Sequence, residues 1–392
     1  MKQKLTHSRF LIPGIILLGI VLRTPFTTLS TVLSDIASGL GVEVSSLGLL
    51  TSLPLLTFAI FSPFAASLAK RFGIERLFLG VLIVMTLGSA LRTFNLPLLY
   101  VGTILVGAGI AFINVLLPSL IQANQPNRLG FLTTLYITSM GLSTAVASSV
   151  AVPITKATSW QGLVWVLTAV CALALVIWLP NVGHNHYLEP DSSTSENSGS
   201  WYKSGKVWAI MIFGGLQSLF FYTTITWLPT MATQAGVGEA NAGILASVFT
   251  LTSIPFSMIV PSLITKLSNR NRHVMLVATV LAGLIGVAML LVNTDSFVYW
   301  LVLNLLIGSS ASVLFPYMMV VFSMKASSPE KTAQLSGLAQ TGGYIFAALG
   351  PVLFGSSKQL FNSWTPAVLI LLVLTLIMGI ALYKVEKTDL IL

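Results

Sequence analysis

The sequence predicts an all-α integral membrane protein with twelve transmembrane helices, arranged as two six-helix pseudo-repeats with both termini in the cytoplasm. Three observations lead to this prediction. The 392 residues are 55% hydrophobic and only 8% charged, far below the charged share of about 25% in soluble domains. Twelve apolar runs are each long enough to cross a hydrocarbon core of about 30 Å. The basic residues are concentrated in alternate loops.

The apolar runs predict the spans in order along the chain. The first six are expected at residues 10–34, 46–69, 77–94, 98–121, 130–154 and 161–180. The second six are expected at residues 205–230, 240–264, 273–292, 297–322, 334–356 and 365–383. All these runs are much longer than the alternating segments of about 10 residues that build a membrane β-barrel. Helical spans are therefore predicted.

The placement of the basic residues predicts the orientation in the membrane. Sixteen of the 20 Lys and Arg residues lie on the side of the two termini, whereas only Arg92, Lys156 and Lys358 lie on the opposite side. Because basic loops remain in the cytoplasm, both termini are predicted to be cytoplasmic and the number of spans to be even. The same bias explains the net charge of +9 without a nucleic-acid partner. We expect a multi-pass protein of the cell's inner (plasma) membrane.

A polar stretch rich in Ser, Asn and Glu separates the first six spans from the last six. It predicts an N-terminal bundle over residues 1–180, a flexible cytoplasmic linker over 181–203 and a C-terminal bundle over 204–392. His184 and His186 lie in this linker, but a solvated pair without further ligands rarely holds a metal.

The two halves resemble each other in sequence. GVEVSSLGLL at 41–50 matches GVGEANAGIL at 236–245, each between the first and second span of its half. In this register Arg23 corresponds to Ser218, which lies beside Gln217. Parallel repeats of six spans around a central path are the layout of many secondary transporters.

One charged residue interrupts the first apolar run. Arg23 lies about 20 Å into the span, where a cation costs about 2.5–3.5 kcal/mol on insertion scales. Thr27, Ser30 and Ser34 follow at helical spacing and predict a polar stripe on the same face. A structural arginine bonded to neighbouring carbonyls is one interpretation. A substrate or ion path is the one we favour, because intramembrane ionisable groups usually mark such a path.

Acidic residues are absent from the predicted interior of every span. The 11 Asp and Glu residues fall in loops or at span ends, with Asp35 at the outer end of the first span. A bound anion is therefore the expected partner of Arg23, through charge-assisted and bidentate hydrogen bonds. Arg92, near the outer end of the third span, is expected to reach the membrane surface instead.

Neutral polar side chains at mid-span depth are candidates for the rest of a substrate site. Asn and Gln amides and Tyr hydroxyls can donate hydrogen bonds to oxyanions or nitro groups without adding a charge. Each of them could equally serve as an interhelical hydrogen bond. The candidates are Asn114, Tyr136, Gln217, Tyr222, Asn304, Tyr317, Gln340 and Tyr344.

Four stretches of the sequence, together with Arg23 and Pro25 of the first span, resemble the sequences of one known family. They are LGLLTSLPLLTFAIFSPFAASLAKRFGIER (47–76), GIAFINVLLPSLI (109–121), LQSLFFYTTITWLP (216–229) and QLSGLAQTGGYIFAALGPVLFG (334–355). These stretches resemble the major facilitator superfamily, and closely its cyanate permease / 2-nitroimidazole exporter branch.

The loop between the second and third spans departs from the family at one position. The superfamily signature there is G-x-L-x-D-R-x-G-R-R, and this chain has Ala66, Leu68, Lys70, Arg71 and Gly73 at the corresponding positions. A lysine therefore replaces the aspartate of the signature.

The resemblance implies a transporter of the major facilitator fold that works by alternating access. Together with Arg23 it favours a small anionic or anion-like polar solute, such as cyanate, as the substrate. The alternatives are an exporter of neutral nitroaromatic or drug-like compounds and a membrane sensor that transports nothing. The expected partners are the solute and the lipid bilayer. No nucleic acid, metal, cofactor or catalytic residue is expected, since no enzyme motif is present, and the monomer is expected to be the functional unit.

Overall fold

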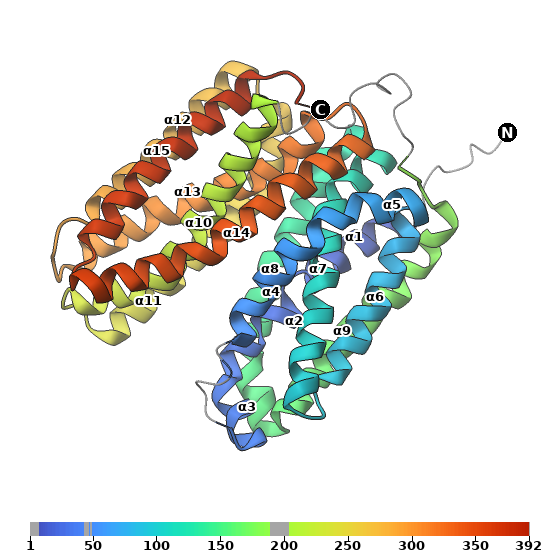
Figure 1. Ribbon diagram of the computed structural model, residues 1–392, viewed down its shortest axis with the longest axis horizontal. Coiled ribbons are helices and arrows are strands. Elements are labelled where there is room, and N and C mark those ends of the chain that lie inside the picture. The colour runs from blue at the N-terminus through green and yellow to red at the C-terminus, as the bar shows by residue number, and fades with distance from the viewer. Residues whose placement is uncertain (1–7, 43–46, 48, 189–203, 392) are drawn as a thin grey trace. The chain divides into compact units, whose positions relative to one another are not determined.

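The computed structural model describes residues 8–42, 47, 49–188 and 204–391, and all regular structure in this part of the chain is helical (Figure 1). It contains twelve helical stretches that are long and apolar enough to cross a membrane, which confirms the predicted number. The first six are Leu11–Leu40, Leu53–Phe72, Ile74–Leu91, Leu96–Asn124, Pro126–Ala157 and Trp160–His184. The second six are Gly205–Gln234, Ala240–Lys266, Asn269–Met289, Phe297–Met324, Pro329–Phe361 and Thr365–Lys387.

Several helices continue beyond the apolar runs that predicted them. The first span ends at Leu40 rather than near residue 34, and the eleventh begins at Pro329 rather than near residue 334. Hydrophobicity marks only the depth of the hydrocarbon core, whereas helical hydrogen bonding continues into polar sequence until a cap ends it. Asp35 consequently lies inside the first span and not at its end.

The first six spans are built from thirteen labelled helical segments of the described chain. They are α1 (Leu11–Val21), α2 (Thr24–Thr27), η1 (Leu29–Val32), α3 (Leu33–Leu40), α4 (Leu49–Phe61), η3 (Ser62–Phe64), α5 (Ala65–Phe72), α6 (Ile74–Leu91), α7 (Leu96–Asn124), η4 (Pro126–Arg128), α8 (Leu129–Ala157), α9 (Trp160–Trp178) and η5 (Leu179–His184). The η segments are short 3₁₀ turns, which occur where a span bends or ends.

Small residues allow close helix contacts in this half of the chain. A Cβ atom at Gly19 of α1 would lie 2.5 Å from the backbone oxygen of Tyr136 on α8. A Cβ atom at Gly88 of α6 would lie 2.7 Å from the Cβ of Leu105 on α7. Side chains at these glycines would force the helices apart, so the glycines permit the backbones to pack directly.

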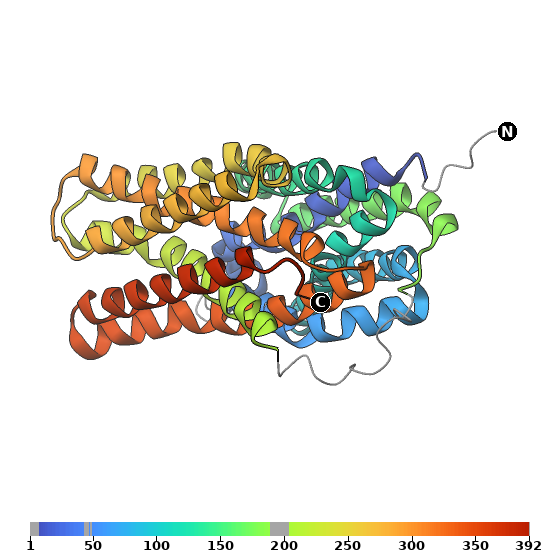
Figure 2. The ribbon, with the colours of Figure 1, turned by 90° about the horizontal axis from the view of Figure 1, so that it is seen from above.

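The last six spans are α10 (Gly205–Gln234), α11 (Glu239–Lys266), α12 (Asn269–Met289), α13 (Phe297–Met324), α14 (Pro329–Phe361) and α15 (Thr365–Lys387). Within this half α12 packs against α13 and α15, while α11 packs against α13 (Figures 1 and 2). The buried cluster that these helices form together with α10 includes Phe220, Trp300, Leu303 and Leu371, each at most 3% exposed. Helix starts are set by polar caps such as Ser296, whose hydroxyl accepts a hydrogen bond from the backbone N–H of Tyr299.

The chain divides into two compact units. The first comprises Met1–Ser193 and Ser327–Gly337, and the second comprises Thr194–Ala326 and Leu338–Leu392. The start of α14 therefore groups with the first unit. The predicted boundaries at 180 and 204 remain a prediction, and residues 189–203 of the linker lie outside the described residues.

Residues 185–188, which the sequence assigned to the flexible linker, lie against the start of α6. The Asn185 side chain donates to the backbone oxygen of Phe72 (3.0 Å) and accepts from the backbone N–H of Arg76 (3.1 Å). His186 places its Nδ1 2.6 Å from the Oε1 of Glu75, and its backbone N–H donates to the other oxygen of that carboxylate. This part of the linker is an ordered strap. The His186 ring pairs with the buried carboxylate of Glu75.

Candidate functional site

Arg23 lies where the first span is broken. α1 ends at Val21 and α2 begins at Thr24, and Arg23 between them has φ −125° and ψ −47°, outside the helical geometry. Its side chain is half-buried, and its backbone oxygen accepts hydrogen bonds from the backbone N–H groups of Phe26 (3.0 Å) and Thr27 (2.9 Å). Pro25 sits directly after the break, as expected for a residue that cannot donate a helical hydrogen bond. The interrupted backbone explains how an arginine is accommodated inside an apolar span.

The expected polar stripe after Arg23 is altered by this break. The Thr27 hydroxyl donates to the backbone oxygen of Arg23 (3.0 Å), and the Ser30 hydroxyl donates to that of Thr27 (2.6 Å). Residues 29–32 form a 3₁₀ turn before α3 resumes, so the spacing of 3.6 residues per turn does not hold from Arg23 to Ser34. The prediction that Ser34 shares the face of Arg23 assumed one regular helix between them, and that assumption is wrong.

Arg92 differs most from its expected position. It was expected to reach the membrane surface, but it is only 1% exposed and donates from a terminal nitrogen to the backbone oxygen of Pro25 at 2.6 Å. Its Nε has no hydrogen-bond partner within the described part of the chain. The break in the first span leaves carbonyl groups available, and a guanidinium from the end of α6 reaches one of them. Pro25 signals an interrupted helix in the sequence, but it frees the carbonyl four residues earlier and not its own, so the sequence does not predict this contact.

Two further candidates of the first unit come from helices that contact the broken span. Asn114 is half-buried on α7, and Tyr136 on α8 is 2% exposed. α2 packs against α7, α8 and α9, so the helices that carry Asn114 and Tyr136 both touch the segment that follows Arg23. The structure thus brings the elements carrying these three predicted residues together.

In the second unit, Gln217 on α10 and Gln340 on α14 lie on helices in close contact. A Cβ atom at Gly343 would lie 3.3 Å from the backbone oxygen of Gly214, and these glycines are each one helical turn from the two glutamines. Gln217 and Gln340 are 2% and 3% exposed.

Hydroxyl groups next to these glutamines hold their amides in place. The Tyr344 hydroxyl donates to the Oε1 of Gln340 at 3.2 Å, and the Ser218 hydroxyl donates to the Oε1 of Gln217 at 3.5 Å. A glutamine amide whose oxygen accepts a hydrogen bond has its NH₂ group as its donor. Gln217 and Gln340 thus each have an amide oxygen that accepts a hydrogen bond from a neighbouring hydroxyl.

The other three candidates of the second unit have different surroundings. Tyr222 is half-buried on α10 with its ring edge-on to Phe221, at 5.2 Å between centroids. Asn304 donates to the backbone oxygen of Trp300 on its own helix at 2.9 Å. Tyr317 donates its hydroxyl to Glu386 at 2.7 Å. The donors of Asn304 and Tyr317 are thus engaged in contacts that stabilise the second unit.

Acidic residues of the spans lie in terminal turns or close to them. Glu75, Glu239 and Glu330 lie in the first turn of α6, α11 and α14, and Glu386 lies in the last turn of α15. Asp35 lies in α3, about 18 Å along the chain from Arg23 at helical rise. The mid-depth polar groups are therefore an arginine and neutral donors. These features are typical of a membrane transporter: an arginine at a helix break, polar groups on the helices that contact it, and two units of six spans each.

The chain belongs to the Major Facilitator Superfamily, whose family model matches residues 15–351 and 210–390. It is 34% identical to an uncharacterized transporter of Bacillus subtilis, over 97% of this chain and 94% of that protein. It is 33% identical to the 2-nitroimidazole transporter of Escherichia coli, over 94% of this chain and 93% of that protein. The cyanate transport protein of Escherichia coli is more distant, at 22% identity over 89% and 90% of the two chains. The resemblance to this branch is therefore confirmed.

Solved structures share the fold of this chain. The proton:xylose symporter XylE superposes with a TM-score of 0.78 over 96% of this chain and 95% of its own, at 12% identity. The fucose:proton symporter of Escherichia coli superposes with a TM-score of 0.72 over 96% and 99% of the two chains, at 14% identity. At these identities the likeness establishes the fold alone. The chain is a transporter and not an enzyme.

Proposed function

We propose that this protein moves a small anionic or anion-like polar solute, such as cyanate, across the membrane by alternating access, with Arg23 as the electrostatic anchor. The observation that carries the proposal is a half-buried arginine at the break between α1 and α2. A guanidinium presents several N–H donors in one plane and binds oxyanions through charge-assisted hydrogen bonds. In a site with low water content such contacts are stronger than at a protein surface.

The neutral donors support the same chemistry. The amides of Asn114, Gln217 and Gln340 and the hydroxyls of Tyr136 and Tyr222 are groups that can donate to a solute without repelling its charge. Tyr344 acts through Gln340, to which its hydroxyl donates. An anion meets no carboxylate at mid-span depth, because the acidic residues of the described spans lie in or near their terminal turns. Asn304 and Tyr317 contribute less to the proposal, because their donors are bonded to Trp300 and Glu386.

A neutral nitroaromatic solute is the second candidate. It is favoured by the relative named 2-nitroimidazole transporter, which is 33% identical over most of both chains, whereas the cyanate transport protein is 22% identical. The oxygens of a nitro group accept hydrogen bonds, so Arg23 could bind either class of compound. The two candidates differ in the charge that the site must compensate.

Counterflow in proteoliposomes tests the role of Arg23. We expect Arg23→Gln to lower cyanate exchange by about tenfold to hundredfold, since a hydrogen bond to a charged group contributes about 1.5–3 kcal/mol. Arg23→Lys should restore only part of the rate, because a lysine cannot form the planar bidentate contact. Arg128→Gln, which removes an exposed arginine of η4, is the matched control and should leave exchange unchanged. Unchanged exchange by Arg23→Gln would contradict the anchor.

Competition and thermal shift separate the two substrates. A ligand that binds the native site raises the melting temperature by mass action. If cyanate raises it and Arg23→Gln abolishes the shift, the anionic substrate is supported. If 2-nitroimidazole raises the melting temperature and competes for uptake while cyanate does neither, the second candidate is correct.

A further inference from the structure

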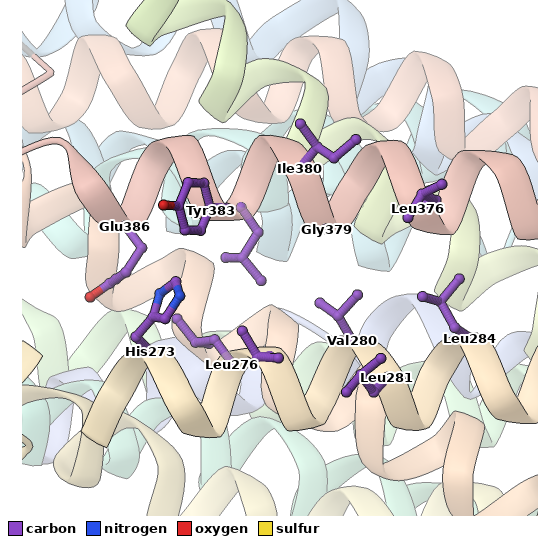
Figure 3. Close-up of a pocket in the computed structure, with 12 residues that line it drawn as sticks. His273, Leu276, Val280, Leu281, Leu284, Leu376, Gly379, Ile380, Tyr383 and Glu386 are labelled. Atoms are coloured by element: carbon purple, nitrogen blue, oxygen red, sulfur yellow. The ribbon is translucent and has the colours of Figure 1, made fainter. Parts of the chain in front are cut away.

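An apolar groove runs along the outside of the second unit between α12 and α15 (Figure 3). On α12 its lining residues recur at helical spacing, as do those on α15. They are His273, Leu276, Val277, Val280, Leu281 and Leu284 on α12 and Leu376, Gly379, Ile380, Leu382, Tyr383 and Glu386 on α15. Apart from His273, Tyr383 and Glu386, which lie together at one end, every lining side chain is apolar. The groove therefore has a hydrocarbon body and one polar end.

The size and position of the groove match one half of a bilayer. From His273 to Leu284 the α12 wall is about 16 Å long, close to half of a hydrocarbon core of about 30 Å. The groove has a volume of about 270 Å³. Val277 and Leu281 are 44% and 51% exposed and Ile380 is 52% exposed. Because α12 and α15 are membrane-spanning helices, these exposed side chains face the lipid. An extended hydrocarbon chain fits such a groove.

The polar end of the groove is rich in cations and aromatic rings. The His273 ring lies edge-on to Tyr383, at 5.1 Å between centroids, and the ammonium of Lys387 lies 5.9 Å from the centre of the Tyr383 ring. Arg270 and Lys384 are exposed beside them. Arg270, Lys384 and Lys387 therefore place three positive charges, together with the imidazole ring of His273, at the end of the groove.

The carboxylate in the groove does not cancel these charges. One oxygen of Glu386 accepts a hydrogen bond from Arg272 at 2.6 Å and the other accepts from Tyr317 at 2.7 Å. The remaining acidic residue at this end is Asp389, which is exposed beyond the last turn of α15. Arg270, Lys384 and Lys387 thus leave a net positive charge.

We propose that the groove between α12 and α15 binds a phospholipid with an anionic headgroup. One acyl chain lies in the apolar groove, and the phosphate and headgroup lie at the end formed by His273, Tyr383, Lys384 and Lys387. The charge complementarity favours an anionic lipid over a zwitterionic one, because surface lysines attract anionic headgroups whereas a net-neutral headgroup gains little. Tyr383 lies at the same end of the groove, and tyrosine side chains are enriched at the membrane–water interface, where lipid headgroups lie.

Native mass spectrometry of the purified full-length protein tests the headgroup preference. The protein is exchanged into mixed micelles with equal amounts of phosphatidylglycerol and phosphatidylcholine, and retained lipids are counted. We expect preferential retention of phosphatidylglycerol. Lys384→Gln/Lys387→Gln should lower that preference by about ten- to thirtyfold. Arg71→Gln/Arg128→Gln, which removes two exposed cations from the first unit, should not. Equal retention of both lipids by the wild-type protein would overturn the proposal.

A second pair of variants tests the groove itself. Val277→Trp fills the groove, whereas Val274→Trp places the same side chain on an exposed residue of α12 that does not line it. We expect Val277→Trp alone to reduce lipid retention, with both variants melting within a few degrees of the wild type. If Val277→Trp instead changes the oligomeric state measured by light scattering and leaves lipid retention intact, the groove is a contact between copies of the chain and the proposal is wrong.

Discussion

Arg23 and Arg92 are two cations of the first unit with different environments. Arg23 is half-buried at the break of the first span, whereas Arg92 is 1% exposed and bonded to the carbonyl of Pro25, two residues beyond Arg23. The hydrogen bond from Arg92 stabilises the irregular backbone next to Arg23. Arg92 is therefore a positioning residue for the arginine that we propose binds the solute.

Removing Arg92 should displace the break without unfolding the protein. We expect Arg92→Met to lower transport by about tenfold, since a charge-assisted hydrogen bond contributes about 1.5–3 kcal/mol, and Arg92→Lys to retain an intermediate rate. The rate at which a thiol reagent labels Arg23→Cys, in a Cys171→Ala background, reports the position of the break independently of any substrate. An identical labelling rate with and without Arg92 would contradict the positioning role.

Lys70 is the residue that replaces the aspartate of the family's loop signature. Its ammonium forms an ion pair with Glu330, in the first turn of α14. Nearby, the Ser119 hydroxyl donates to the backbone oxygen of Pro329, and Thr332 donates to the side chain of Gln122. The substitution at position 70 is therefore accompanied by a carboxylate that suits a lysine, and the start of α14 is held within the first unit.

At the scale of elements, the strap of residues 185–188 holds the start of α6. The Ile74 backbone N–H donates to the backbone oxygen of His186 at 2.9 Å, and Glu75, which is 1% exposed, accepts from His186 and from Asn124 at 3.0 Å. The hydrogen bond to Glu75 raises the pKa of His186 above its usual value of 6.5, against the opposing effect of burial. The protonated imidazolium is the form that holds the strap most strongly.

The strap should loosen as the pH rises. Because the pKa of His186 is higher in the folded state, its contribution to stability is fully present below about pH 6.5 and is lost as the pH rises through the raised pKa. Hydrogen exchange at the Ile74 amide, expressed as a protection factor, should show this loss. His186→Gln should give a protection factor that no longer changes over the same range. A pH dependence that persists in the variant would exclude His186 as its cause.

The broken first span and the unbroken α10 begin the two units in different ways. The first span consists of α1, α2, η1 and α3, whereas α10 runs without interruption from Gly205 to Gln234. Arg23 lies at the break, and Ser218, its counterpart in the register predicted from the sequence, lies within α10 and donates to Gln217. The pseudo-repeat is therefore asymmetric in chemistry, with a cation in one unit and neutral donors in the other.

At the scale of the whole molecule, the bias of basic residues predicts cytoplasmic N- and C-termini. Reporters fused to the C-terminus test this orientation. Green fluorescent protein should fluoresce there and alkaline phosphatase should be inactive, because the basic loops remain in the cytoplasm. Phosphatase inserted after Thr158, between α8 and α9, should be active. The opposite pattern would reverse the predicted orientation and place the basic end of the α12–α15 groove in the outer leaflet.

Much of the fold was predictable because the membrane imposes a strong constraint on sequence. Each span must be apolar over about 20 residues and must satisfy its own backbone hydrogen bonds, so twelve apolar runs predict twelve helices. The same constraint singled out Arg23, because a charge within an apolar span costs free energy and usually marks a functional site. The glutamines and Asn114 were identified from their residue type and depth, which are local properties of the sequence.

The amino-acid sequence by itself determined the all-helical class, the number of spans, the family and the list of polar residues at mid-span depth. Only the tertiary structure decided which of these side chains meet. Arg92 with Pro25, Tyr317 with Glu386 and Lys70 with Glu330 are each separated by more than 60 residues. Such pairs depend on how helices cross and where a span breaks, and hydrophobicity, which is an average over one helix, carries no information about either.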